Sequence, residues 1–396
     1  MQALHLYGLP LALLAADRLL TSARTRDACW LAAWMIVITY TSGYLAVFGA
    51  IMTTVAMLVR AGDWWARPVP VLGRFLLAAV IFAIAVLPLS IPYARAAREQ
   101  GMVRSLEGVG EYSATVQGYL AAAGTIHMST WSRFFFKDPV DSFFAGFVII
   151  ALAGAGVRAA RWRDRSPDET VARRRILMMI AISAAGFVLS LGTRTPVYGW
   201  LYHLFPPMHG LRAAARFGIL FLFGMSVLAG FGLAAFRRAR PASGRAAFAA
   251  ALLLVVVNLE AVRAPFHYQT FDGIPRVYSL LANEPAVVLA EVPFYPRRAA
   301  FENAEYVLNA TAHWRPLMNG YSGYVPASYA NYADTFWYFP RDGAIDAMRR
   351  AGVTHVMVHP ERFGREAEQV MAALEERRDF ELMAVGPRGL RLYRLR

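Results

Sequence analysis

The chain has 396 residues, of which 57% are hydrophobic and only 17% are charged, and its formal net charge is +14. The apolar residues form several long blocks instead of recurring at amphipathic spacing, which argues against a protein that is water-soluble along its whole length. The basic excess does not indicate nucleic acid, because most of the arginines flank apolar blocks, where positive charge sets membrane topology and contacts anionic headgroups. We therefore expect membrane lipids, and no nucleic acid, as partners.

Eight apolar segments are predicted to cross the membrane as helices, since a hydrocarbon core needs roughly 20 apolar residues of helix. The predicted spans are 3–20, 28–42, 44–60, 74–91, 142–158, 176–192, 215–236 and 246–262. Between the second and third spans, Thr41-Ser42-Gly43 favours a tight reversal between two short helices, with one long kinked helix as the alternative.

Arginines in two short loops predict how these spans are oriented. Seven arginines lie in 158–175 and four lie in 237–245, so both loops are expected to be cytoplasmic. Alternation from these two loops gives the sides of the remaining segments. It places 22–27 and 61–73 inside, and 92–141, 193–214 and everything after 263 outside.

The first predicted external loop, 92–141, contains an aromatic cluster around Trp131 that suits the headgroup level of a bilayer. It also contains carboxylates that could act as a general base towards an acceptor hydroxyl, although solvated surface charge is the plainer interpretation of each. These catalytic candidates are Glu107, Glu111, Asp138 and Asp141.

After residue 263 the apolar runs shrink to strand length, and charge, tyrosine and proline become more frequent. Residues 264–396 are therefore predicted to form one soluble α/β domain that follows the helical membrane domain 1–263. The predicted strands are 286–293, 353–359, 380–385 and 390–395, and the predicted helices are 275–283, 342–351 and 364–377.

The second predicted external loop, 193–214, gathers polar groups at the membrane face. Arg212 and Arg216 are spaced i, i+4, so on a helix they would share one face and could clamp a lipid-linked phosphate; the alternative is that both reach towards headgroups. Tyr198, Tyr202, His203 and His209 precede them as candidates for acceptor or glycan binding, or for interfacial hydrogen bonding.

A loop of the tail, 313–324, is typical of a surface that faces saccharides, because aromatic rings stack on sugar C–H groups and amides or guanidinium groups bind hydroxyls. Its candidates are Trp314, Arg315, Asn319 and Tyr321. Packing of the same aromatic side chains against the sheet is an equally good interpretation. No nucleotide-binding, zinc or nucleophile motif is present in the sequence, no cofactor is identified, and nothing in it supports a divalent metal.

The order of these features resembles a known family. The segment LGTRTPVYGWLYHLFPPMHGLRAAARFGILFLFGMSVLAGFGLA, one further span, and a tail with HWRPLMNGYSGYVP and THVMVH resemble bacterial membrane proteins of the GT-C glycosyltransferase superfamily, close to its YfhO-like branch. The resemblance covers most of the chain. It implies a multi-pass protein of the bacterial plasma (inner) membrane that takes sugar from a polyprenyl-phosphate carrier and adds it to an outside acceptor.

By this resemblance, Arg212 and Arg216 correspond to the branch's arginine pair and face the carrier phosphate. The family's opening helix and its loop with the catalytic acid would lie upstream of MQALHLYGLP, so the sequence departs from the pattern at its start. The resemblance thus implies either a truncated sequence or a protein without catalysis.

Three functions follow as hypotheses. The first is a GT-C-like glycosyltransferase, or a carboxyl-terminal fragment of one, that transfers sugar from a polyprenyl-phosphate donor to an envelope glycan or protein. The second is a non-catalytic membrane-anchored scaffold or glycan-binding protein. The third is a transporter, which is disfavoured because Asp17 and Glu260 lie near span ends rather than at mid-bilayer.

Overall fold

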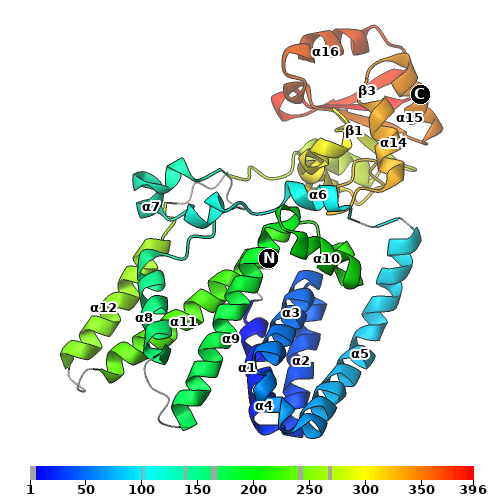
Figure 1. The fold of residues 1–396 in the computed structure, drawn as a ribbon. Helices are drawn as coiled ribbons and strands as arrows, with labels where there is room; N and C mark the ends of the chain where they lie inside the picture. Colours follow the sequence, from blue (N-terminus) through cyan, green and yellow to red (C-terminus); the bar gives the residue numbers. More distant parts are fainter. Residues whose placement is uncertain are drawn as a thin grey trace. The chain divides into compact units, whose positions relative to one another are not determined.

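The protein is mostly helical and has one small sheet near its carboxyl end, as seen in a computed structural model (Figure 1). The structure describes residues 6–99, 101–102, 104–137, 141–161, 167–239, 244–265 and 270–396. The chain divides into two compact units, residues 1–267 and residues 268–396, which we call the helical unit and the tail unit.

The helical unit is built from long helices joined by short helical turns. The long helices are α1 (Gly8–Ser22), α2 (Thr25–Thr41), α3 (Gly43–Val59), α5 (Pro68–Glu99), α8 (Phe147–Arg161), α9 (Pro167–Ser190), α11 (Gly218–Arg238) and α12 (Gly244–Ala261). The short helices are α4 (Ala61–Trp65), α6 (Leu106–Glu111), α7 (Thr125–Thr130) and α10 (Pro196–Leu204). Single 3₁₀ turns are η2 (Gln117–Leu120), η3 (Ser132–Phe134), η4 (Gly192–Arg194), η5 (Pro206–Gly210) and η6 (Ala214–Phe217).

Three helical segments in the described part of the chain are long and apolar enough to cross a membrane: Pro68–Glu99, Ala214–Arg238 and Gly244–Ala261. Their apolar side chains are largely exposed, as expected of surfaces that face lipid. A helix is present at every one of the eight predicted spans, but the number eight is not confirmed. Four of the other helices are short: α2 and α3 have 17 residues, and α1 and α8 have 15, which span only about 22 Å at 1.5 Å per residue. The remaining helix, α9, has 24 residues but contains Arg173, Arg174 and Arg175.

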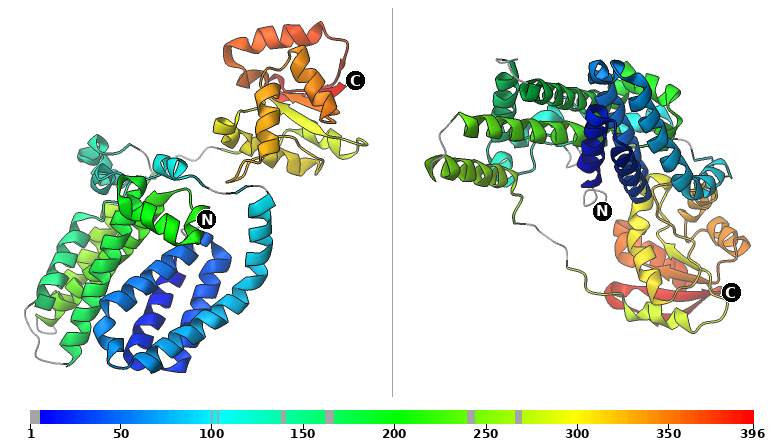
Figure 2. Two further views of the ribbon diagram at one scale, coloured as in Figure 1. Left: turned by 45° about the vertical axis from the view of Figure 1, so that its right-hand side comes forward. Right: turned by 90° about the horizontal axis from the view of Figure 1, so that it is seen from below.

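The long helices form two groups, and α9 packs against both (Figures 1 and 2). In the first group α1, α2, α3 and α5 pack together, and in the second α11 packs on α8. Glycines permit the close approach of α11, since a Cβ atom on Gly232 would lie 1.8 Å from the carbonyl oxygen of Leu152 and one on Gly224 would lie 2.1 Å from Ser183 Oγ. Such small residues are the usual way in which helices approach closely in membranes.

The break predicted at Thr41-Ser42-Gly43 is confirmed as a reversal rather than a kink. Ser42 has extended dihedral angles (φ −166°, ψ 134°), and its hydroxyl caps α3 by accepting a hydrogen bond from Tyr44 N. The predicted loop 92–141 begins later than expected, because α5 continues to Glu99 with Pro88 and Pro92 inside it.

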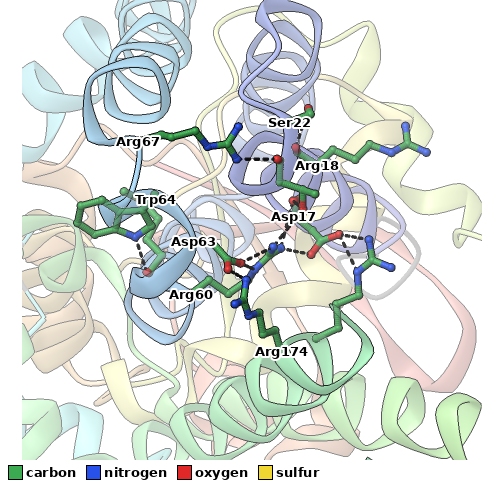
Figure 3. A network of polar contacts seen from close by, with 11 residues as sticks. Asp17, Arg18, Ser22, Arg60, Asp63, Trp64, Arg67 and Arg174 are labelled. Carbon is green, nitrogen blue, oxygen red and sulfur yellow. Dashed lines mark hydrogen bonds and ion pairs between the residues drawn. The ribbon is translucent and has the colours of Figure 1, made fainter. Parts of the chain in front are cut away.

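A buried network of charges joins α1, α3, α4 and α9 at one end of the helical unit (Figure 3). Arg60 lies between two carboxylates, and only 2% of its side chain is exposed: it pairs with Asp17 on α1 and with Asp63 on α4. From α9, Arg174 pairs with Asp63 and Arg175 pairs with Asp17 at 2.8 Å. The network therefore joins Asp63 of segment 61–73 and the two arginines of segment 158–175 to α1, which ends at segment 22–27. The arginine pattern predicts that all three segments lie on the cytoplasmic side.

The tail unit is an α/β fold with a four-stranded sheet in the order β1-β2-β4-β3. Its strands are β1 (Leu289–Val292), β2 (His355–Val358), β3 (Phe380–Val385) and β4 (Arg391–Leu395), and its helices are α13 (Ala304–Asn309), α14 (Ala327–Phe336), α15 (Asp342–Arg350) and α16 (Ala367–Glu375). Its 3₁₀ turns are η7 (Arg276–Ala282), η8 (Arg297–Asn303), η9 (Ala310–Ala312), η10 (Pro360–Arg362), η11 (Gly364–Glu366) and η12 (Pro387–Gly389). β1 and β2 are parallel, whereas β4 is antiparallel to both β2 and β3.

Both faces of the parallel strands β1 and β2 are buried, which explains their nearly continuous apolar sequences. Side chains alternate between the faces: Ala290 and Val292 pack with α14, α15 and α16, whereas Leu289 packs with η7. Glu291 is two residues after Leu289, so its side chain lies on the same face of the sheet. The alternation therefore places a carboxylate inside the apolar layer under η7.

Candidate functional site

Two tyrosines and two arginines meet at the end of the helical unit where α3 and α11 begin, and we call them the arginine–tyrosine cluster: Tyr44, Tyr112, Arg212 and Arg216. The guanidinium carbon of Arg212 lies 4.4 Å from the ring centre of Tyr112, and that of Arg216 lies 4.5 Å from the ring centre of Tyr44. A guanidinium stacked on an aromatic face keeps its N–H groups, which lie in its own plane, directed past the ring.

The two arginines do not share a helix face, contrary to the prediction from their spacing. The backbone is extended at Leu211 and Ala213, and the 3₁₀ turn η6 begins only at Ala214. The Tyr44 hydroxyl is the reason, because it accepts hydrogen bonds from the N–H groups of Arg212 at 2.9 Å and of Ala213 at 2.8 Å. Stacking on separate tyrosines, rather than helical spacing, holds the two guanidinium groups.

The turn before the cluster is held by hydrogen bonds to the segment after α5. The Tyr202 hydroxyl donates to Arg104 O at 2.7 Å, Arg104 N donates to His209 O at 3.1 Å, and His209 Nε2 lies 3.0 Å from Tyr202 O. Tyr202 is 8% exposed and Tyr198 is fully buried. Both tyrosines are thus core residues out of reach of a glycan in this conformation, whereas His203 is exposed.

The four carboxylate candidates differ in how available they are. Glu107 and Glu111 are exposed on α6, directly before Tyr112. Asp141 is held by Thr115, whose N–H donates to Oδ1 at 2.9 Å and whose hydroxyl donates to Oδ2 at 2.6 Å. Asp138 lies outside the described residues. Of the three candidates that the structure describes, Glu107 and Glu111 are therefore the exposed ones, and Glu111 directly precedes Tyr112 of the arginine–tyrosine cluster.

In the tail unit, the predicted saccharide loop divides into structural and exposed residues. Asn319 is buried and pairs with the backbone of Glu291, accepting from its N–H at 2.7 Å and donating to its carbonyl at 2.9 Å. Arg315 donates to the carbonyls of Leu281 and Ala282. These contacts commit both side chains to the fold, because they satisfy backbone groups at the sheet edge and at the end of η7. Trp314 is 83% exposed.

Tyr321 lines a pocket of about 400 Å³ in the tail unit. Four tyrosines contribute to its wall, together with Pro326, Ser322 and Ser328. We call it the tyrosine pocket, and its tyrosines are Tyr321, Tyr324, Tyr329 and Tyr332. Tyr321 and Tyr324 belong to the predicted loop 313–324, whereas Tyr329 and Tyr332 lie on α14, a helix that the sequence pattern did not predict. In the described residues, no group of three or more His, Cys, Asp or Glu side chains could hold a metal ion.

Tyr44→Phe tests how the cluster is built. Loss of the hydroxyl leaves the N–H groups of Arg212 and Ala213 without their acceptor, and we expect local stability to fall by about 1–3 kcal/mol. Hydrogen exchange of peptides that cover 205–217 would measure the loss. Tyr40→Phe is the control, since the Tyr40 hydroxyl donates one bond to Ala85 O far from this turn in the sequence. Equal exchange in both variants and the parent would contradict the role of Tyr44.

Comparison with known protein families gives no match for this chain, and no curated protein matches it.

Proposed function

We propose that the protein is a GT-C-like membrane protein that binds a polyprenyl-phosphate-linked sugar at the arginine–tyrosine cluster and transfers the sugar to an envelope glycan or protein. The observation that carries the proposal is Arg212: its guanidinium is exposed, stacks on Tyr112, and makes no side-chain hydrogen bond among the described residues. Arginine is suited to phosphate because its planar fork offers paired donors.

The surroundings of the cluster support a lipid-linked ligand. The apolar segment that crosses the membrane, Ala214–Arg238, starts directly after Ala213, so a phosphate at Arg212 and Arg216 would sit where a carrier lipid leaves the hydrocarbon layer. Glu107 and Glu111 on α6 are the carboxylates that could accept a proton from an acceptor hydroxyl. We propose Glu111 for this role, because it is adjacent in sequence to Tyr112.

Donor binding tests the proposal directly. We expect Arg212→Ala and Arg216→Ala to weaken binding of a radiolabelled polyprenyl-phosphate sugar by tenfold or more, at about 1.5–3 kcal/mol for each charged hydrogen bond lost. Arg133→Ala is the matched control: Arg133 is exposed and stacks on Phe134 at 4.9 Å. Unchanged donor affinity in both variants would contradict the proposal and would favour the alternative, in which the two arginines contact lipid headgroups.

The proposal also requires the eight-span topology, with 92–141, 193–214 and the tail unit outside the cytoplasm. Cys29 is the only cysteine, so a Cys29→Ser background permits single-cysteine mapping. Gly320→Cys and Gly62→Cys suit this test, because both positions are exposed and an added Cβ atom meets nothing within 4 Å. We expect a membrane-impermeant thiol reagent to label residue 320, but not residue 62, in intact cells. Labelling of 62 alone would exclude the proposed orientation.

The tyrosine pocket favours a second candidate function, a membrane-anchored glycan-binding protein without catalysis. Four tyrosine rings and two serine hydroxyls around about 400 Å³ suit the apolar faces and hydroxyls of one or two sugar rings. Tyr321→Ala and Tyr332→Ala should weaken binding of short oligosaccharides, whereas Trp314→Ala, outside the pocket, should not. Retained oligosaccharide binding together with no donor binding would favour this candidate over the transferase.

A further inference from the structure

The tail unit contains a larger cleft, of about 1160 Å³, which none of the predicted site residues lines. It lies at the carboxyl ends of the parallel strands β1 and β2, the usual place for ligands in α/β folds. Its polar residues include His359, Glu361, Asn309 and Glu305. The segment 270–277 and the turn between β3 and β4 complete the lining.

A buried hydrogen-bonded chain stands behind His359. The carboxylate of Glu291, fully buried on β1, accepts from the Tyr278 hydroxyl at 2.6 Å, and its Oε2 atom lies 2.7 Å from His359 Nε2. Asn309 Nδ2 donates to the Tyr278 hydroxyl at 3.2 Å. Burial raises the pKa of Tyr278, and the adjacent Glu291 raises it further, so Tyr278 stays a donor. Glu291 therefore fixes a proton on His359 Nε2 and turns Nδ1 towards Glu361.

His359 Nδ1 and Glu361 Oε1 lie 3.5 Å apart at the cleft. When His359 is neutral with its proton on Nε2, both facing atoms are acceptors, and they are satisfied only if a donor reaches both. Among the described residues, no arginine nitrogen lies within ion-pair distance of the Glu361 carboxylate. The side chain of Glu361 is 39% exposed, so a donor can reach it from the cleft.

The other groups that face His359 do not provide this donor. The Tyr306 ring packs on the imidazole with 4.7 Å between centres. Arg362, the nearby cation, stacks on the outer side of Tyr306 at 5.0 Å and is paired with Glu305. At the cleft itself Arg388 pairs with Asp272, and Arg276 is exposed. None of these three arginines lies within ion-pair distance of Glu361, so the carboxylate of Glu361 remains available to a ligand.

The mouth of the cleft combines exposed apolar side chains with the charged residues Asp272, Arg276 and Arg388. Phe271, Leu280, Leu308 and Val385 line it and are 44% to 65% exposed. Exposed apolar side chains around a polar base are typical of a pocket that binds an amphipathic small molecule.

We propose that this cleft binds a small ligand that carries a primary ammonium group on an apolar body, with the ammonium donating to Glu361 and to His359 Nδ1. The apolar body occupies the mouth, and the fixed Nε2 proton leaves Nδ1 as the acceptor. This proposal is independent of the glycosyltransferase proposal, since it rests on the tail unit only.

The ligand competes with a proton for His359. Burial disfavours the charged imidazole, but hydrogen bonds to Glu291 and Glu361 outweigh burial and raise the pKa of His359 above its ordinary value. A protonated His359 fills the position of the ligand ammonium. Affinity should therefore rise with pH, by about tenfold per unit while the pH is below this pKa, and then level off.

Calorimetric titration of the full chain in detergent with 2-phenylethylamine tests the proposal, with 2-phenylethanol as the neutral comparison. We expect the amine to bind at least tenfold more tightly than the alcohol and Glu361→Gln to remove most of that difference. Glu381→Gln, a change at an exposed carboxylate paired with Arg396, should leave binding unchanged. Because Glu361 is partly exposed, Glu361→Gln should keep the fold, which thermal unfolding would verify.

Three outcomes would each overturn the proposal: no binding of the amine in the millimolar range, equal affinity for amine and alcohol, or undiminished amine binding in folded Glu361→Gln. Affinity that falls as pH rises towards neutrality would also contradict it. Neither donor binding nor its loss in Arg212→Ala bears on these outcomes, so the two proposals can fail separately.

Discussion

Replacement of Arg60 by Met is expected to lower the free energy of unfolding of the helical unit by about 3–5 kcal/mol. Arg60 is 3% exposed and pairs with both Asp17 and Asp63 (Figure 3). The methionine fills a similar volume but leaves two buried carboxylates with fewer partners, and an uncompensated buried charge is strongly destabilising. Thermal unfolding in detergent micelles, followed by circular dichroism, would measure the loss.

Arg67→Met is the matched control for this change. Arg67 is exposed and its Nη2 donates one hydrogen bond to Thr21 O at 3.1 Å. An exposed contact of this kind contributes about 1 kcal/mol or less. If Arg60→Met destabilised the protein no more than Arg67→Met, the network would not hold the helix ends together. The double variant Asp17→Asn/Arg60→Met should be less destabilised than the sum of the two single variants, because the groups are in direct contact.

Replacement of Glu291 by Gln is expected to destabilise the tail unit by about 3 kcal/mol at low pH and by less at high pH. Burial lowers the pKa of His359 in the folded protein, but the hydrogen bonds to Glu291 and Glu361 raise it by more, so the net shift is upward. The neutral amide of glutamine cannot stabilise the charged imidazole in this way. A group with a raised folded pKa contributes stability that is fully present below its unfolded value of about 6.5 and is lost as pH rises through the folded value.

Native-state hydrogen exchange in peptides that contain β1 and β2 measures this effect in the full chain. The difference in protection between the parent and Glu291→Gln, compared at equal pH, should be largest below the unfolded pKa of about 6.5 and should shrink as the pH rises through the raised folded pKa of His359. Glu381→Gln serves as the control, since Glu381 is on β3 and pairs with the exposed Arg396. A difference that grew with pH would show that His359 is not the partner that matters.

The sequence alone determined the elements that local pattern specifies. The four strands of the tail unit were predicted correctly, because short apolar runs bounded by turn residues leave few alternatives. The reversal at Ser42 was also predictable from its turn residues. By contrast, α14 was missed, because ASYANYADTF has no apolar periodicity and gains its helical packing from Tyr329, Ala333 and Phe336 against the sheet.

The candidate sites depended more on tertiary structure. Arg212 and Arg216 were found from spacing, but what positions them is Tyr44, which is 168 residues from Arg212 in sequence. Asn319 and Arg315 were chosen for their chemistry, and only the fold showed that backbone groups use them. The sequence did contain a signal for Glu291, because it is the only charged residue in the apolar strand AVVLAEVP. A carboxylate in such a strand is buried only when it has partners, so its position indicates a buried polar network.

Composition and period therefore decided that this is a largely helical chain with helices apolar enough to cross a membrane and an α/β tail, since the period of apolar residues reports the local secondary structure. Tertiary structure alone decided which polar groups remain available, because a side chain's hydrogen-bonding capacity is spent on whichever backbone or ionic partner folding brings within about 3 Å. That is why Arg212, Glu361 and Tyr321 keep exposed side chains, while Asp141, Asn319 and Arg60 hold the fold.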